Sequence, residues 1–167
     1  MLTIKLPISL NISDQLVIAD LQRQQSCVIR SAYKLFQKGN NEQQIRAKLK
    51  TIHNIVLVDS WFQQSAIKDA HYMHLADIEL EVNTRVFGGK KNLQSRSNNK
   101  LSNTDWKKLR LLPITSIGEA CKTGNRKFNL HVIDENKIIC KLNKNTHVGI
   151  QLPRLKKKYK DVLQQLE

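Results

Sequence analysis

The spacing of apolar residues changes near residue 84 of this chain. Between residues 13 and 83 the apolar residues recur at the 3.6-residue spacing of an amphipathic helix, and beyond Asn83 they form short runs that alternate with polar residues. The first spacing places apolar side chains on one face of a helix, and the second places them on one face of a strand. The chain is therefore predicted to be an α+β protein in which most of the helices precede most of the strands.

The periodicity predicts five helices, at residues 13–38, 41–52, 58–82, 104–110 and 154–166. Ser13 is the expected N-cap of the first helix and Gly39 its expected C-cap. Asn41 and Gln44 have the spacing of a capping box at the start of the second helix. The polar run from Ser95 to Asn103 is predicted to be a loop.

Strict alternation predicts four strands, at residues 2–10, 128–132, 138–142 and 147–152. Pro7 makes the first of them an edge strand, because proline cannot donate a ladder hydrogen bond. The turn residues at 134–136 predict a hairpin between the second and third strands.

Composition excludes several classes of protein. Of the 167 residues, 40% are hydrophobic and 25% charged, as in ordinary globular proteins. The sequence contains neither a long apolar run nor a signal-peptide pattern, which predicts a cytoplasmic protein without a membrane partner. The three cysteines Cys27, Cys121 and Cys140 form no C-x-x-C pair, which argues against a disulfide framework and a zinc ribbon.

Charge is concentrated in the second half of the chain. The sequence holds 28 Lys and Arg against 14 Asp and Glu, a net charge of +14. Residues 1–84 carry 9 basic and 8 acidic side chains, whereas residues 85–167 carry 19 and 6, a net +13. Such an excess is typical of a surface that binds nucleic acid, because each neutralised phosphate releases counterions. The alternative is a basic surface that is merely well solvated.

Three clusters of cations, each with an aromatic residue, are candidate phosphate contacts: residues 87–96, 122–128 and 154–160. In the first cluster the two glycines would let the backbone approach a ligand, and the aromatic ring could stack on a base. The alternative places Phe87, Phe128 and Tyr159 in the core and the lysines on a solvated face. The predicted nucleic-acid-binding residues are Phe87, Gly88, Gly89, Lys90, Lys91, Arg96, Lys107, Lys108, Arg110, Lys122, Arg126, Lys127, Arg154, Lys157 and Lys158.

Catalytic and metal-binding patterns are weak. His71 and His74 have a spacing that could hold a metal ion, but no third ligand matches them, so a solvated polar face is preferred. The few carboxylates of the basic half do not form the cluster that a two-metal nuclease needs. No catalytic residue, metal or cofactor is predicted.

Four short motifs in order, and one earlier segment, resemble a known family. They are RVFGGKKN (85–92), LRLLP (109–113), SIGEA (116–120) and KTGNRKF (122–128), preceded by DSWFQQSAI (59–67). Together they resemble the front half of the TnpB-like (OrfB) proteins encoded by bacterial insertion sequences, which are relatives of type V CRISPR effectors.

This resemblance implies a small basic β-barrel, an oligonucleotide-binding-like wedge domain, with a three-helix insertion after its first strand. Residues 1–12 would be the first barrel strand and 13–83 an insertion like the family's recognition lobe. Residues 84–167 would be the rest of the barrel with a basic C-terminal helix. In the family an RNase H-like nuclease domain follows, and this sequence stops about where that domain would start, so the chain as given is expected not to be an enzyme.

The expected function is binding of guide-like RNA or an RNA–DNA heteroduplex, mainly by shape and backbone charge, by a truncated TnpB-like transposon protein. The expected partners are this RNA, target DNA, and a separately encoded nuclease domain. One alternative is the nucleic-acid-binding part of a split nuclease or transposase. Another is a small RNA-binding structural protein of ribosomal type.

Overall fold

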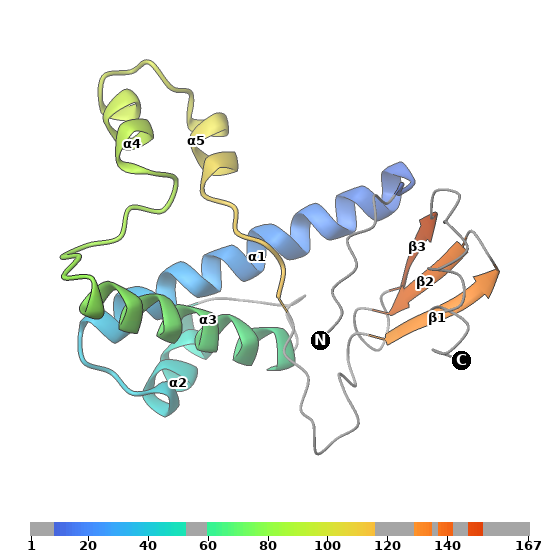
Figure 1. Cartoon of the computed structure of the whole chain (residues 1–167), viewed down its shortest axis with the longest axis horizontal. Helices are drawn as coiled ribbons and strands as arrows, with labels where there is room; N and C mark the ends of the chain where they lie inside the picture. Colours follow the sequence, from blue (N-terminus) through green and yellow to red (C-terminus); the bar gives the residue numbers. More distant parts are fainter. Residues whose placement is uncertain (1–8, 53–59, 116–128, 135–136, 142–146, 152–167) are drawn as a thin grey trace. The chain divides into compact units, whose positions relative to one another are not determined.

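Five helices and three strands follow one another along the part of the chain that the computed structural model describes, residues 9–52, 60–115, 129–134, 137–141 and 147–151 (Figure 1). In chain order they are α1 (Ile12–Gln37), α2 (Glu42–Ile52), α3 (Ser60–Glu79), α4 (Lys90–Ser97), α5 (Asn103–Leu109), β1 (Asn129–Asp134), β2 (Lys137–Lys141) and β3 (His147–Gln151). Most of the predicted first strand, and the predicted helix at 154–166, lie outside the described residues.

The chain divides into two compact units. Residues 20–115 form a helical unit, and residues 1–19 with 116–167 form a unit that contains the sheet. The domain boundaries predicted from the sequence lay elsewhere, after residues 12 and 83. Residues 84–115, which were expected to belong with the strands, are part of the helical unit.

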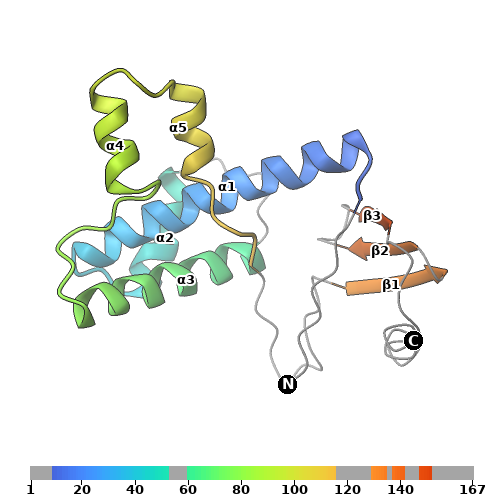
Figure 2. The ribbon, with the colours of Figure 1, turned by 45° about the horizontal axis from the view of Figure 1, so that its top comes forward.

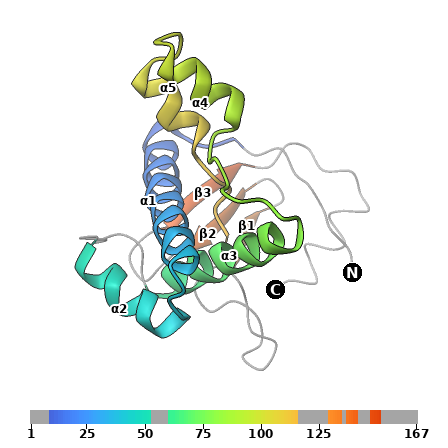
Figure 3. The same cartoon turned by 90° about the vertical axis from the view of Figure 1, so that its left-hand side faces the viewer.

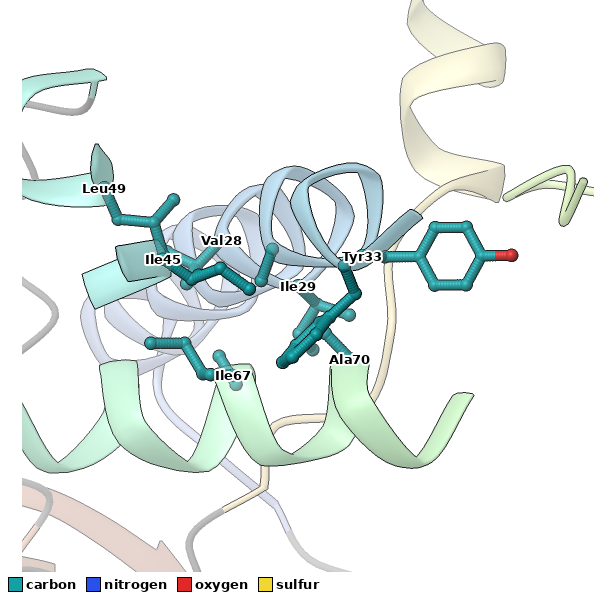
Figure 4. Close-up of a cluster of buried hydrophobic side chains, with 10 residues drawn as sticks. Val28, Ile29, Tyr33, Ile45, Leu49, Ile67 and Ala70 are labelled. Carbon is teal, nitrogen blue, oxygen red and sulfur yellow. The ribbon is translucent and has the colours of Figure 1, made fainter. Parts of the chain in front are cut away.

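The core of the helical unit lies between α1, α2 and α3 (Figure 4). Val28, Ile29 and Tyr33 of α1 contribute side chains that are at most 1% exposed. Ile45 of α2 and Ile67 of α3 are fully buried against them. The apolar residues at helical spacing therefore form the predicted core of three helices.

Local capping accounts for the ends of the first two helices. The amide of Gln44 donates to the Asn41 side chain and the amide of Asn41 donates to the Gln44 side chain, at 2.9 and 3.0 Å, which confirms the capping box. Gly39 has a φ of 77° at the end of α1, as a glycine C-cap should. The predicted N-cap Ser13 was wrong, because Asn11 accepts the amide of Asp14 at 2.8 Å.

The prediction of a β-barrel was wrong. The described strands form an open antiparallel sheet in the order β1-β2-β3, with Leu130 opposite Cys140 and Cys140 opposite Val148. An isolated bridge joins Ser9 to Gln151 of β3, with N–H···O distances of 3.1 Å in both directions. Alternation specifies which residues form strands, but it carries no information on whether a sheet closes.

Residues 84–115 are the second reason for this correction, because they contain α4 and α5 in place of barrel strands. The loop predicted from Ser95 to Asn103 was partly wrong, since α4 extends to Ser97. The predicted helix at 104–110 is confirmed as α5.

The segment from Leu111 to Thr115 is attached to α1 by hydrogen bonds from α1 side chains to its backbone amides and carbonyls. The Gln25 side chain accepts the amide of Thr115 at 3.0 Å and donates to its carbonyl at 2.6 Å. The Ser26 hydroxyl accepts the amide of Leu112 at 2.9 Å, and Gln22 donates to the carbonyl of Leu112 at 3.0 Å. Gln25 and Ser26 are each 1% exposed, so these bonds satisfy polar groups that would otherwise be buried without partners.

None of the helices in the described part of the chain combines the length and apolar character that crossing a bilayer requires.

Candidate nucleic-acid interface

Helices α4 and α5 lie side by side and project from the bundle of α1, α2 and α3 (Figures 2 and 3). Asn99 has a φ of 57° after α4, and the amide of Lys100 donates to the carbonyl of Ser95 at 2.9 Å. Ser102 caps α5 by accepting the amide of Asp105 at 3.0 Å. These caps define a short helical hairpin, which is called the α4–α5 hairpin below.

The α4–α5 hairpin and the segments on either side of it are strongly basic. Residues 85–115 carry 8 basic side chains and 1 acidic one, whereas residues 20–84 of the same unit carry 8 and 7. The exposed cations of the hairpin are Lys90, Lys91, Lys100, Lys107 and Lys108. The basic character of this unit is therefore concentrated on its projecting part.

The antiparallel arrangement brings two lysine pairs to the same end of the hairpin. A Cβ on Gly88, just before α4, would lie 2.7 Å from the ring of Trp106 and 3.1 Å from Cγ of Arg110. The beginning of α4 and the end of α5 are therefore in contact. Lys90 and Lys91 follow this contact point on α4, and Lys107 and Lys108 lie beside it on α5, so residues 17 positions apart in sequence form one cationic end.

The two glycines serve the packing of the hairpin. The amide of Gly89 donates to the carbonyl of Val86 at 3.0 Å, and Gly88 has a φ of 98°, as the third residue of a type II turn requires. The ring of Trp106 occupies the space beside Gly88. The sequence suggested that these glycines let the backbone approach a ligand. In the structure the backbone at Gly88 instead lies close to the ring of Trp106.

Phe87 occupies the alternative, core position that the sequence left open. It is half-buried against the core cluster, and its ring meets that of Tyr33 edge to face at 5.4 Å. This contact joins the turn before α4 to helix α1.

The two arginines of the hairpin make internal contacts. Arg96 is half-buried and donates to the carbonyl of Leu101 at 3.0 Å, which holds the connection between the helices. The guanidinium of Arg110 lies 5.5 Å from the centre of the Trp106 ring, a cation–π arrangement. The carbonyl of Arg110 accepts a hydrogen bond from Arg30 of α1 at 2.8 Å.

The remaining predicted binding residues, Lys122, Arg126, Lys127, Arg154, Lys157 and Lys158, lie outside the described residues. The structure therefore places the other nine of the fifteen predicted residues on the α4–α5 hairpin or directly beside it. Sequence reasoning missed Arg30, Lys100 and Trp106. Trp106 had a usable signal, since an aromatic residue directly precedes two lysines. Arg30 had none, because it lies in the nearly neutral half of the chain.

An ion pair between a buried aspartate and a half-buried arginine anchors the segment that leads into the hairpin. Arg85 donates two hydrogen bonds to Asp77, at 2.6 and 2.8 Å, and the Tyr33 hydroxyl donates to the same carboxylate at 2.8 Å. Asp77 is 4% exposed. The bonds from Arg85 hold the pKa of Asp77 below its ordinary value, while burial and the bond to Asp77 raise the pKa of Tyr33.

His71 and His74 pack against Phe36. Their rings stack on Phe36 with centroids 4.8 and 6.0 Å away, and Nδ1 of His71 lies 3.5 Å from Glu42. In the described part of the chain, no three His, Cys, Asp or Glu side chains lie close enough together to hold a metal ion. These contacts give both histidines a packing role on α3.

A family model described as the SSO2105 N-terminal domain matches residues 1–167. Comparisons with curated proteins and with solved structures found no match.

Proposed function

The chain belongs to the SSO2105 N-terminal domain family, and we propose that it binds nucleic acid through the cationic surface of the α4–α5 hairpin. The proposed ligand is an RNA or an RNA–DNA heteroduplex. The resemblance of residues 85–92 and 109–113 to TnpB-like proteins supports this choice of ligand, and both motifs border the hairpin.

The observation that carries the proposal is a set of five exposed lysines, four of which have no carboxylate partner in the described part of the chain. Of the five exposed lysines of the hairpin, only Lys108 has a carboxylate within 4.0 Å in the described part of the chain, Asp105 at 4.0 Å. Cations on the same end of a short hairpin repel one another unless an anion neutralises them. A nucleic-acid backbone supplies such anions at regular spacing, and their neutralisation releases counterions.

The shape of the surface favours contacts to phosphates over contacts to bases. Its two helices have 8 and 7 residues, with a lysine pair at the start of α4 and another near the end of α5. The aromatic rings beside it, Phe87 and Trp106, are half-buried and packed against other parts of the protein. Point charges on flexible lysine stems bind phosphate oxygens without reading base edges. Binding should therefore depend strongly on salt and weakly on sequence.

The test is charge reversal on the hairpin against a matched charge reversal elsewhere. Lys90, Lys91 and Lys107 are replaced by Glu in one variant. Lys34, Lys38 and Lys50, which are exposed on α1, α2 and their connection, are replaced by Glu in the control, which has the same net charge. Fluorescence anisotropy measures binding to single-stranded RNA and to an RNA–DNA heteroduplex, each of about 20 nucleotides, over a series of salt concentrations.

We expect the hairpin variant to lower the log–log salt slope by about 2–3, since three phosphate contacts are lost at ~0.7–0.9 each. The control should keep nearly the wild-type slope. Equal losses in the two variants would show that only net charge matters and would refute the hairpin as the binding surface. Circular dichroism should show similar melting for both variants, because exposed lysines contribute little to stability.

A further inference from the structure

Two arginines from distant parts of the sequence meet where the hairpin joins α1. Arg30 lies in the second half of α1, and its Nη1 donates to the carbonyl of Arg110, the C-cap residue of α5, at 2.8 Å. This bond places a cation beside the last carbonyls of α5, where the helix dipole favours positive charge. It also brings the Arg30 guanidinium to the backbone of a residue that carries a second guanidinium.

Neither of these arginines has a carboxylate partner in the part of the chain that the structure describes. Each of three other arginines has one: Arg23 with Asp20, Arg46 with Glu42, and Arg85 with Asp77. Burial lowers the pKa of Arg30, and the charge of Arg110 lowers it further. The Cys27 side chain acts in the opposite direction and raises this pKa. The hydrogen bond to the Arg110 carbonyl nevertheless holds the half-buried Arg30 cation directly beside a second half-buried arginine.

The Arg110 side chain has contacts at its stem and at its guanidinium group. Its Cγ packs beside Gly88, and its guanidinium lies over the ring of Trp106. Its Nε is buried and has no hydrogen-bond partner among the described residues. A buried guanidinium N–H without a partner is uncommon and needs an acceptor.

We propose that Arg30 and Arg110 together bind a single phosphate group at the foot of the α4–α5 hairpin. The inference rests on the proposed function, since the phosphate is assigned to the bound nucleic acid. The alternative source of the same chemistry is a free phosphate ion. Two planar guanidinium groups offer forked donors that match phosphate oxygens, and the anion would relieve their mutual repulsion.

The salt dependence of RNA binding can show whether the two arginines share one phosphate or contact two separate phosphates. Arg30→Gln, Arg110→Gln and the double variant are compared in the salt-dependent RNA titration, with Arg23→Gln as a control on the same helix. Loss of one phosphate contact lowers the slope by ~0.7–0.9. We expect each single variant and the double variant to show the same loss of one contact, and the control to show none. A double variant that loses two contacts, or single variants that lose none, would overturn the shared site.

A second measurement separates the source of the phosphate and guards against misfolding. The melting temperature of each protein is followed as inorganic phosphate replaces chloride at constant ionic strength. A rise in the wild type that is lost in Arg30→Gln, together with the slope loss in RNA, supports the nucleic-acid phosphate. A rise without any slope loss assigns the site to free phosphate and overturns our assignment. If RNA does not bind at all yet the phosphate-dependent rise persists, the proposed function fails while the anion site stands.

Discussion

Replacement of Gly88 by Ala should weaken the α4–α5 hairpin through a steric clash and through backbone strain. The same replacement at Gly89 causes backbone strain alone, so the two effects can be measured separately. The added Cβ would lie 2.7 Å from Cζ3 of Trp106, roughly 0.8 Å inside the shortest favourable carbon–carbon separation of ~3.5 Å. The backbone φ of 98° is also unfavourable for any residue with a Cβ. Gly89, with a φ of 87° and nothing closer than 3.7 Å, has only the second effect.

The expected magnitudes follow from these geometries. Gly89 combines a φ of 87° with a ψ of 146°, a backbone region that residues with a Cβ rarely adopt, and this costs an alanine about 1–3 kcal/mol, which should be the whole effect of Gly89→Ala. Overpacking against the tryptophan ring adds about 1–3 kcal/mol at Gly88. The excess of Gly88→Ala over Gly89→Ala should therefore be about 1–3 kcal/mol, which corresponds to a ~5–150-fold faster exchange of amides that open with the hairpin.

Native-state hydrogen exchange read by mass spectrometry measures this excess on peptides that cover α4 and α5. The same two substitutions are then made in a Trp106→Leu background, which removes the ring that the new Cβ would meet. Additivity fails for residues in contact, so the excess at Gly88 should disappear in that background. Equal exchange in the two alanine variants, or an excess that survives Trp106→Leu, would refute the packing role assigned to Gly88.

Three further outcomes are expected. Asp77→Asn should lower the free energy of unfolding by about 2–3 kcal/mol in urea titrations, because it strips Arg85 of a bidentate partner, a loss moderated by the 36% exposure of that arginine. The pKa of Asp77 is lowered in the folded protein, so the ionised carboxylate stabilises the fold at pH values above the ordinary aspartate pKa. This stabilisation is lost as the pH falls through the pKa of Asp77 in the folded protein. The difference in unfolding free energy between wild type and Asp77→Asn should therefore shrink below about pH 4 and stay constant above pH 5. Burial raises the pKa of Cys140 to about 11, so this thiol should resist iodoacetamide at pH 8 until the protein unfolds, and rapid native labelling would contradict its burial at 2% exposure.

The parts of the fold that sequence predicted are those where one periodic pattern decides a local structure. The three-helix core and the β1–β2 hairpin followed from apolar spacing, and Gly39 and Asn41 marked helix ends through their own backbone chemistry. Helix α4 was missed because its eight residues include a single apolar side chain, Leu93, which gives no period to detect. The false barrel came from the resemblance of residues 85–128, since closure of a sheet is a long-range property that no local pattern encodes.

The candidate site was predictable in its charges and not in its architecture. Local sequence shows that Lys90 and Lys91 are basic, but it cannot show that an antiparallel hairpin sets them beside Lys107. The structural role of Gly88 was likewise hidden, because the ring that requires it comes eighteen positions later in the chain. Arg30 joins the site only through tertiary contact with Arg110.

The pairing of Gln25 with Thr115 limits how early this protein can finish folding during its synthesis on the ribosome. The two residues are 90 positions apart, so at synthesis rates of 5–20 residues per second roughly 5–18 s pass between them. During most of that interval Gln25 and Ser26 lack their hydrogen-bond partners, Thr115 and Leu112, and cannot be buried without leaving polar groups unsatisfied. The helical unit therefore cannot complete its fold before the hairpin has been synthesised, because residues 111–115, which supply these partners, follow the hairpin in the chain.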